Sequence, residues 1–168
     1  DAAFYACRLK EVWIPNSCQT IAGTNTFQQN YPLKKIHLPE GLGRIPSCFA
    51  NDCWDLQEVN IPSTVKSIDR AAFEQCKSLK KINLPDGLET IEREAFYHCD
   101  SLEQIIFPAT LNFLGQECCS YMPGLKRIYC MSSEPPVCKE STLNPGNSPF
   151  GKYNSDFYLR TPNDIPIY

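Results

Sequence analysis

The stretch Leu-Lys-Lys-Ile-Asn-Leu-Pro-Asp-Gly-Leu-Glu-Thr-Ile-Glu-Arg-Glu-Ala-Phe-Tyr-His-Cys, residues 79–99, decides the fold because it recurs along the chain. Its first leucine returns at nearly equal steps, at Leu9, Leu33, Leu56, Leu79, Leu102 and Leu125. Only the first of these steps differs from the others, and it is one place longer. A β-branched residue follows each leucine by three places, at Val12, Ile36, Val59, Ile82, Ile105 and Ile128. A period kept in several columns at once indicates a solenoid in which each repeat forms one coil.

Each coil is expected to contain two short strands. Apolar and polar residues alternate in Leu-x-x-Ile-x-Leu, which is typical of a half-buried strand. The proline that follows ends this strand, since it cannot donate to a ladder between neighbouring coils. The motif Gly-Leu-x-x-Ile then supplies a second inward-facing pair, such as Leu88 and Ile91.

A single helical turn is expected after the second strand. Residues 69–75 and 92–98 each begin with an acidic residue, which the N-terminus of a helix favours. Phe73 and Phe96 would fill the interior of the solenoid behind this turn. No coil can bury its apolar side alone, so stacked coils must share one continuous core. At about 4.8 Å per coil, the repeats predict a slab roughly 30 Å long.

The period ends after Met131. We therefore expect residues 1–131 to form the solenoid, with about six coils of which the first is partial. Residues 132–168 are expected to form an irregular C-terminal cap of the same domain, with a final strand at residues 156–162. Because residues 1–8 match the end of a coil, further repeats are expected to precede residue 1.

Composition and charge narrow the range of functions. The formal net charge is −3 with basic and acidic residues interspersed, so no basic face is predicted and nucleic acid is not an expected partner. No apolar run approaches the roughly 18 residues that span a bilayer. His37 stands in a variable outward column beside columns that offer Lys, Glu and Gln, and His98 stands in the polar turn, so no hydrolytic triad is predicted. We expect neither enzyme activity nor a cofactor.

Three of the ten cysteines fall in one column of the repeat. Cys53, Cys76 and Cys99 recur at the same step as the leucines and should occupy the same place on successive coils. A ladder of identical thiols pairs badly, and buried cysteine packs as a small hydrophobic residue, so this column is expected to be reduced core. Cys7 is expected to be its equivalent in the first coil, and Cys18, which aligns with core leucines, is also expected to be buried.

Cys130 and Cys138 flank a Pro-Pro turn and are the one pair for which a disulfide is considered; whether they are bonded stays open. The chain contains no CxxC pair, the spacing that zinc sites commonly use, so no metal site is expected.

The pattern Leu-x-x-Ile-x-Leu-Pro-x-x-Leu-x-x-Ile-x-x-x-Ala-Phe-x-x-Cys is complete at residues 79–99 and almost complete at 56–76. It resembles the BspA-like leucine-rich repeat, a bacterial class, and the ending with Pro135-Pro136, residues 157–162 and Tyr168 is similar to the way many such proteins finish. Asn30, Met122 and Cys118-Cys119 depart from the pattern in core details. The resemblance implies an α/β-type, right-handed leucine-rich-repeat solenoid with coils of about 23 residues. Short strands would lie on one face and short helical or irregular turns on the other.

A candidate binding surface lies on the outward side of the first strand of each coil. Its columns are Trp13, His37, Asn60, Asn83, Ile106 and Tyr129, beside Glu11, Lys35, Glu58, Lys81, Gln104 and Arg127. Solenoids bind through such extended surfaces, and Trp, Tyr and Arg dominate interface energetics.

The family resemblance implies a secreted or cell-surface bacterial protein acting in adhesion, without catalytic residues. We therefore expect a protein partner, such as a host matrix or surface protein, and an extracellular or bacterial cell-surface location. Two alternatives remain. One is a glycan-binding accessory module in which Trp13, Tyr129 or Tyr158 stacks on sugar rings. The other is a structural spacer.

Overall fold

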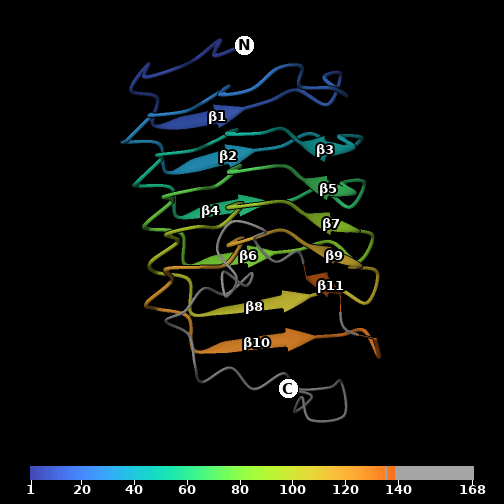
Figure 1. Cartoon of the computed structure of the whole chain (residues 1–168). Coiled ribbons are helices and arrows are strands. Elements are labelled where there is room, and N and C mark those ends of the chain that lie inside the picture. Colours follow the sequence, from blue (N-terminus) through green and yellow to red (C-terminus); the bar gives the residue numbers. More distant parts are fainter. Residues whose placement is uncertain (135, 139–168) are drawn as a thin grey trace.

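The computed structural model describes residues 1–134 and 136–138, and this part of the chain forms a solenoid of stacked coils (Figure 1). The first strands of successive coils are β1 (Glu11–Trp13), β2 (Lys35–His37), β4 (Glu58–Asn60), β6 (Lys81–Asn83), β8 (Gln104–Phe107) and β10 (Arg127–Cys130). The second strands are β3 (Arg44–Ile45), β5 (Ser67–Ile68), β7 (Thr90–Ile91), β9 (Phe113–Leu114) and β11 (Val137–Cys138). The two series run side by side down the stack.

All paired strands are parallel, as the repeat requires, because each coil returns to the same place one winding later. The first strands form a four-stranded sheet in the order β1-β2-β4-β6 and a two-stranded sheet of β8 and β10. The second strands form one five-stranded sheet, β3-β5-β7-β9-β11.

The predicted columns stack in register. Val12 pairs with Ile36, Ile36 with Val59, and Val59 with Ile82. The repeat leucines Leu33, Leu56, Leu79 and Leu102 are completely buried, as are Phe73 and Phe96, whose rings stack with their centroids 5.7 Å apart. One hydrophobic core therefore runs through the stacked coils, as the periodicity predicts.

The expected helical turns are wrong, because residues 69–75 and 92–98 form a chain of tight turns and no helix occurs in the described part of the chain. Two positions in each of five coils have a left-handed backbone, at Asn25, Cys48, Ala71, Glu94 and Glu117 and at Gln29, Asp52, Gln75, His98 and Tyr121. A left-handed residue costs an L-amino acid about 1–2 kcal/mol and interrupts a right-handed helix.

Hydrogen bonds between coils explain why this conformation replaces the helix. The N–H of Phe73 donates to the carbonyl of Ala95 in the next coil at 2.9 Å, while the preceding N–H, that of Ala72, donates within its own coil to Asp69. Alternate N–H groups therefore point along the solenoid axis and bond to the next coil. In a helix, these N–H groups would bond to carbonyls of their own segment. The acidic residues Asp69 and Glu92 would favour a helix N-terminus, but hydrogen bonds to the next coil compete with those of a helix and prevail.

The cysteine column is buried and free of disulfides, as expected. The Cys76 thiol donates to the carbonyl of Ala50 at 3.3 Å, and Cys53 and Cys99 donate in the same way to carbonyls of the preceding coil. Two further expectations fail in the first coil. Cys7 is exposed and Cys18 is only partly buried, because no described coil covers the outer side of residues 1–22.

The second sheet continues past residue 131, where the sequence places the start of the cap, because β11 pairs in parallel with β9. A two-residue strand directly after Pro135-Pro136 is too short to show a period. No disulfide joins Cys130 to Cys138, since Cys130 is buried in β10 and Cys138 is exposed in β11. The predicted final strand at residues 156–162, and Tyr158, lie outside the described residues. The part of the chain that the structure describes contains no helix long and apolar enough to cross a membrane.

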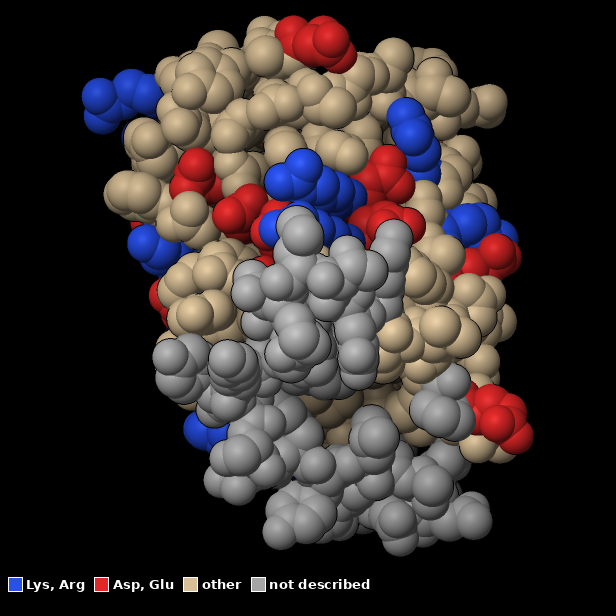
Figure 2. Space-filling view, in the orientation of Figure 1, with Lys and Arg blue, Asp and Glu red and all other residues tan. Residues whose placement is uncertain are grey.

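Opposite charges from successive coils meet on the surface. Arg44 pairs with Asp69 at 3.2 Å, and Arg70 pairs with Glu94 of the next coil at 3.4 Å. Figure 2 shows a group of basic side chains bordered by acidic ones on the face that it presents. Exposed pairs of this kind contribute little each, about 0–1 kcal/mol, so the apolar core carries most of the stacking energy.

Candidate binding surface

The first-strand face is built by strict alternation. In β2, β4 and β6 the central residue is buried and its two neighbours lie on the outer surface. Because side chains alternate between the two sides of a strand, each coil presents two side chains outward. We call this surface, formed by the outward residues of β1, β2, β4, β6, β8 and β10, the strand face.

The structure brings the predicted residues of the strand face together in two groups. Trp13 is paired with His37, His37 with Asn60, and Asn60 with Asn83 across the four-stranded sheet. Ile106 is paired with Tyr129 across the sheet of β8 and β10. The second column follows the same register, from Glu11 through Lys35 and Glu58 to Lys81, and from Gln104 to Arg127.

Trp13 is the most prominent side chain of this surface, with 72% of its area exposed. Its ring lies parallel to that of His37, with the centroids 3.5 Å apart and an interplanar angle of 9°. The Nε2 atom of His37 is 2.8 Å from the Oε1 atom of Glu11, so His37 is held between a ring and a carboxylate. The stack fixes a large aromatic side chain that would otherwise be mobile in solvent.

The charged column of the strand face alternates in sign over its first four coils. Lys35 and Glu58 form an ion pair at 3.4 Å with about half of each side chain exposed. Such a pair is strongly screened by water and contributes little stability, so these charges remain usable by a partner.

Two shallow hollows lie at the strand face and beside it, where lysines gather. One, of about 550 Å³, lies where the chain enters β6, β8 and β10 and is lined by Lys80, Lys81, Ser101, Glu103, Gln104, Gly124 and Lys126. The other, of about 360 Å³, is lined by Gln57, Glu58, Val59, Asn60, Lys80, Lys81 and Asn83. Lys81 therefore stands between two depressions in the part of the face where the two sheets meet.

The titratable groups of the described residues that have shifted pKa values lie apart from the strand face. Among the described residues, no group of three His, Cys, Asp or Glu side chains is placed to hold a metal ion. Burial raises the pKa of the Cys53 thiol to about 12, and burial, followed by the charges of Glu94 and Asp52, raises the pKa of Glu74. These groups belong to the core and the turns, away from the strand face.

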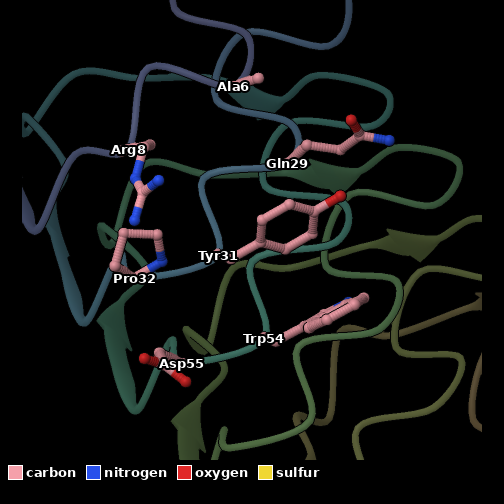
Figure 3. A pocket seen from close by; sticks show the side chains of 7 residues that line it. All are labelled: Ala6, Arg8, Gln29, Tyr31, Pro32, Trp54 and Asp55. Carbon is pink, nitrogen blue, oxygen red and sulfur yellow. The ribbon is translucent and has the colours of Figure 1, made fainter.

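A second surface group, made of two aromatic residues and a lysine, was not predicted from the sequence. Tyr31, Trp54 and Lys77 recur at the step of the repeat and stack at the corner where each coil turns into its first strand. Figure 3 shows the rings of Tyr31 and Trp54. The rings of Tyr31 and Trp54 are 4.5 Å apart, and the Lys77 ammonium lies 4.7 Å from the centre of the Trp54 ring. Their common spacing was the available signal, but the column lies outside the strands and includes no apolar aliphatic residue.

The parallel coils, their shared register and the buried leucines can be compared with known families. A model of the BspA type leucine rich repeat region matches residues 45–137, more than half of the 168-residue chain, with six copies. The chain belongs to the BspA-type leucine-rich repeat family. No curated protein matches the chain closely enough to be reported.

Solved structures of bacterial leucine-rich repeat proteins share the fold. A leucine-rich repeat protein of Bacteroides ovatus is 29% identical with a TM-score of 0.65, over 70% of this chain and 33% of that protein. One from Eubacterium ventriosum is 28% identical with a TM-score of 0.60, over 66% and 30%. A leucine rich cell surface protein of Faecalibacterium prausnitzii is 25% identical with a TM-score of 0.56, over 80% and 44%. The matched part thus spans about a third of the first two proteins and less than half of the third.

Proposed function

We propose that this BspA-type repeat is a non-enzymatic module of a secreted or cell-surface bacterial protein and that it binds a protein partner through the strand face. The observation that carries the proposal is Trp13, a large exposed ring fixed in place by His37 at one end of an extended, in-register surface. The similarity to a cell surface protein of Faecalibacterium prausnitzii supports the proposed location.

The physical case rests on pre-organisation. An aromatic side chain that is already ordered loses little conformational entropy on binding, so more of its contact energy contributes to affinity. Trp and Tyr are the residues that most often anchor interfaces. Trp13 in β1 and Tyr129 in β10 lie at opposite ends of the strand face, and the charged column and the lysine hollows between them provide electrostatic specificity.

A panel of immobilised host matrix and surface proteins tests the proposal. Trp13→Ala combined with Tyr129→Ala should weaken binding to a protein identified on the panel about tenfold or more while leaving the melting temperature nearly unchanged. Tyr121→Ala, which removes a ring 43% exposed on the turn side, serves as the matched control and should bind normally.

Two results contradict the proposal. Unchanged binding by the double variant would show that the strand face is the wrong surface. A panel without any bound protein would favour the structural spacer.

A further inference from the structure

The corner stack of Tyr31, Trp54 and Lys77 ends in a hollow. Lys77 covers Trp54 on one side and Tyr31 contacts it as well, while Arg8, one repeat before Tyr31, lines the hollow beside the two rings. The hollow has a volume of about 450 Å³ and is lined by Ala6, Arg8, Gln29, Tyr31, Pro32, Trp54 and Asp55.

The hollow lies where the first coil is one residue shorter than the coils that follow it. Ala6 and Gln29 are equivalent left-handed positions, yet the repeat leucine comes three places after Ala6, at Leu9, and four places after Gln29, at Leu33. This difference accounts for the longer first step of the repeat. The corner of the first coil, between Ala6 and Leu9, is therefore one residue short.

Asn30 compensates for this shortening in the core. It is completely buried and accepts from the N–H of Leu9 at 3.0 Å through Oδ1, while its Nδ2 donates to the carbonyl of Phe4 at 2.7 Å. The short corner is thus a built and stabilised feature, which also fixes Arg8 with a left-handed backbone that no other described coil has at this place.

The hollow combines an aromatic floor, made by the Tyr31 and Trp54 rings at an interplanar angle of 46°, with polar groups that donate and polar groups that accept hydrogen bonds. Figure 3 shows the flat face of the Tyr31 ring and, below it, the Trp54 ring seen edge-on, with Arg8 and Asp55 to one side and Gln29 to the other. Among the described residues, neither Arg8 nor Asp55 has an ion-pair partner. The rim therefore offers a guanidinium donor, a carboxylate acceptor and an amide.

We propose that this corner hollow is a binding site for a neutral pyranose sugar. A pyranose presents an apolar C–H face, which suits the aromatic floor, and hydroxyl groups that both donate and accept. The hydroxyls would donate to Asp55 and accept from Arg8 and Gln29, so that no buried polar group is left unpaired. The volume lies within the roughly 300–1,000 Å³ typical of small-molecule sites. This site is separate from the strand face and does not depend on the protein partner proposed above.

Other ligands fit the same residues less well. A proline-rich peptide also docks on aromatic side chains, but proline lacks an N–H, so such a peptide offers few donors and would leave the Asp55 carboxylate unpaired. A cationic ligand would suit the rings and Asp55, but it would be repelled by Arg8 and by Lys77 on the far side of the stack.

The Trp54 ring of the aromatic floor is ordered before any ligand binds. The Trp54 Nε1 atom lies 3.3 Å from the Oδ1 atom of Asp52, to which it donates, and the Lys77 ammonium contacts the ring. Both interactions hold the indole in one orientation, which lowers the entropic cost of binding.

Fluorescence of Trp54 tests the proposal directly. Trp13 and Trp54 are the only tryptophans of the chain, so a Trp13→Phe background leaves Trp54 as the sole reporter. Methyl pyranosides of glucose, mannose, galactose and N-acetylglucosamine, and disaccharides of each, would be titrated at millimolar concentration, with deca-proline as the competing ligand class. We expect saturable changes in Trp54 emission with at least one sugar and none with deca-proline.

Variants of the lining residues separate binding from folding. Asp55→Asn and Tyr31→Ala should each weaken sugar binding about tenfold or more, whereas Tyr31→Phe, which keeps the floor, and Tyr121→Ala, on another surface, should bind normally. The absence of saturable binding by every sugar, binding by deca-proline in their place, or full sugar binding by both Asp55→Asn and Tyr31→Ala would overturn the proposal.

Discussion

Asn30 and Cys53 donate to the same acceptor, the carbonyl oxygen of Phe27, the first through Nδ2 at 2.8 Å and the second through Sγ at 3.2 Å. Asn30 also donates through Nδ2 to the carbonyl of Phe4 in the preceding coil at 2.7 Å, which is the bond that each column thiol makes to the coil before it. Asn30 therefore stands at the head of the thiol column and continues its hydrogen-bond pattern with a longer and more polar side chain. The pattern of the repeat treats Asn30 as a departure, but in the structure it performs the role of the column cysteine and also bonds Leu9.

Asn30→Ala should therefore be more destabilising than Cys76→Ala. The first change leaves the partly buried N–H of Leu9 and the carbonyl of Phe4 without the amide that bonds them, and should cost about 2–4 kcal/mol. The second removes one sulfur atom and a weak bond, and should cost about 1–2 kcal/mol. Urea unfolding measures both. Hydrogen exchange at the Leu9 amide should be faster in Asn30→Ala than in the parent protein. A loss of unfolding free energy in Asn30→Ala that is equal to or smaller than the loss in Cys76→Ala would contradict the role given to Asn30.

Gly115→Ala should destabilise the fold because two coils approach closely at this glycine. A Cβ atom there would lie 2.5 Å from the carbonyl carbon of Glu92 and 2.9 Å from the Cα atom of Arg93, both rigid backbone atoms. We expect a loss of about 2 kcal/mol or more in the free energy of unfolding. Gly43→Ala is the matched control, since nothing lies within 4 Å of its Cβ position, and it should be neutral or slightly stabilising.

The left-handed turn positions should tolerate glycine where ordinary turn positions do not. Gln75 has φ of 57°, so Gln75→Gly relieves backbone strain in the folded state. This gain in stability offsets the loss that the extra flexibility of glycine in the unfolded chain causes. Its free energy of unfolding should stay within about 0.5 kcal/mol of the parent or rise. Glu92→Gly, at a position without a left-handed backbone, should lose about 0.5–1 kcal/mol. A larger loss at Gln75 than at Glu92, measured by chemical denaturation, would contradict the strain argument.

The buried thiols should resist alkylation in the native state. Burial disfavours the thiolate and raises the pKa of Cys53 to about 12 and that of Cys76 well above its ordinary value. At pH 8 almost no reactive thiolate is present in this column, and the fraction should grow only as the pH approaches those raised values. Peptide mapping after iodoacetamide treatment should find exposed Cys7 and Cys138 modified first, and rapid labelling of Cys76 in folded protein would contradict this.

The sequence predicts most of the strand face because its buried central residues and the outward residues beside them both recur once in every repeat. Inward Ile36, Val59 and Ile82 recur at one spacing, and the residues on either side of them must then face outward. The sequence shows the longer first step of the repeat but misses the corner hollow, because the hollow is lined by residues of three successive coils that only the folded chain brings together.

The sequence by itself determined the register of the coils, the two strands in each of the coils that begin with β2, β4, β6 and β8, and most residues of the core, since these follow from apolar side chains that return once in every repeat. Only the tertiary structure decided the conformation of the segment that follows the second strand of each coil, such as residues 69–75 and 92–98. There the N–H groups could bond within a helical turn or across to the next coil, and the local pattern is compatible with both. Stacked neighbours supply carbonyl acceptors along the axis, so the chain accepts left-handed residues such as Ala71 and Gln75 and forms turns in place of helices.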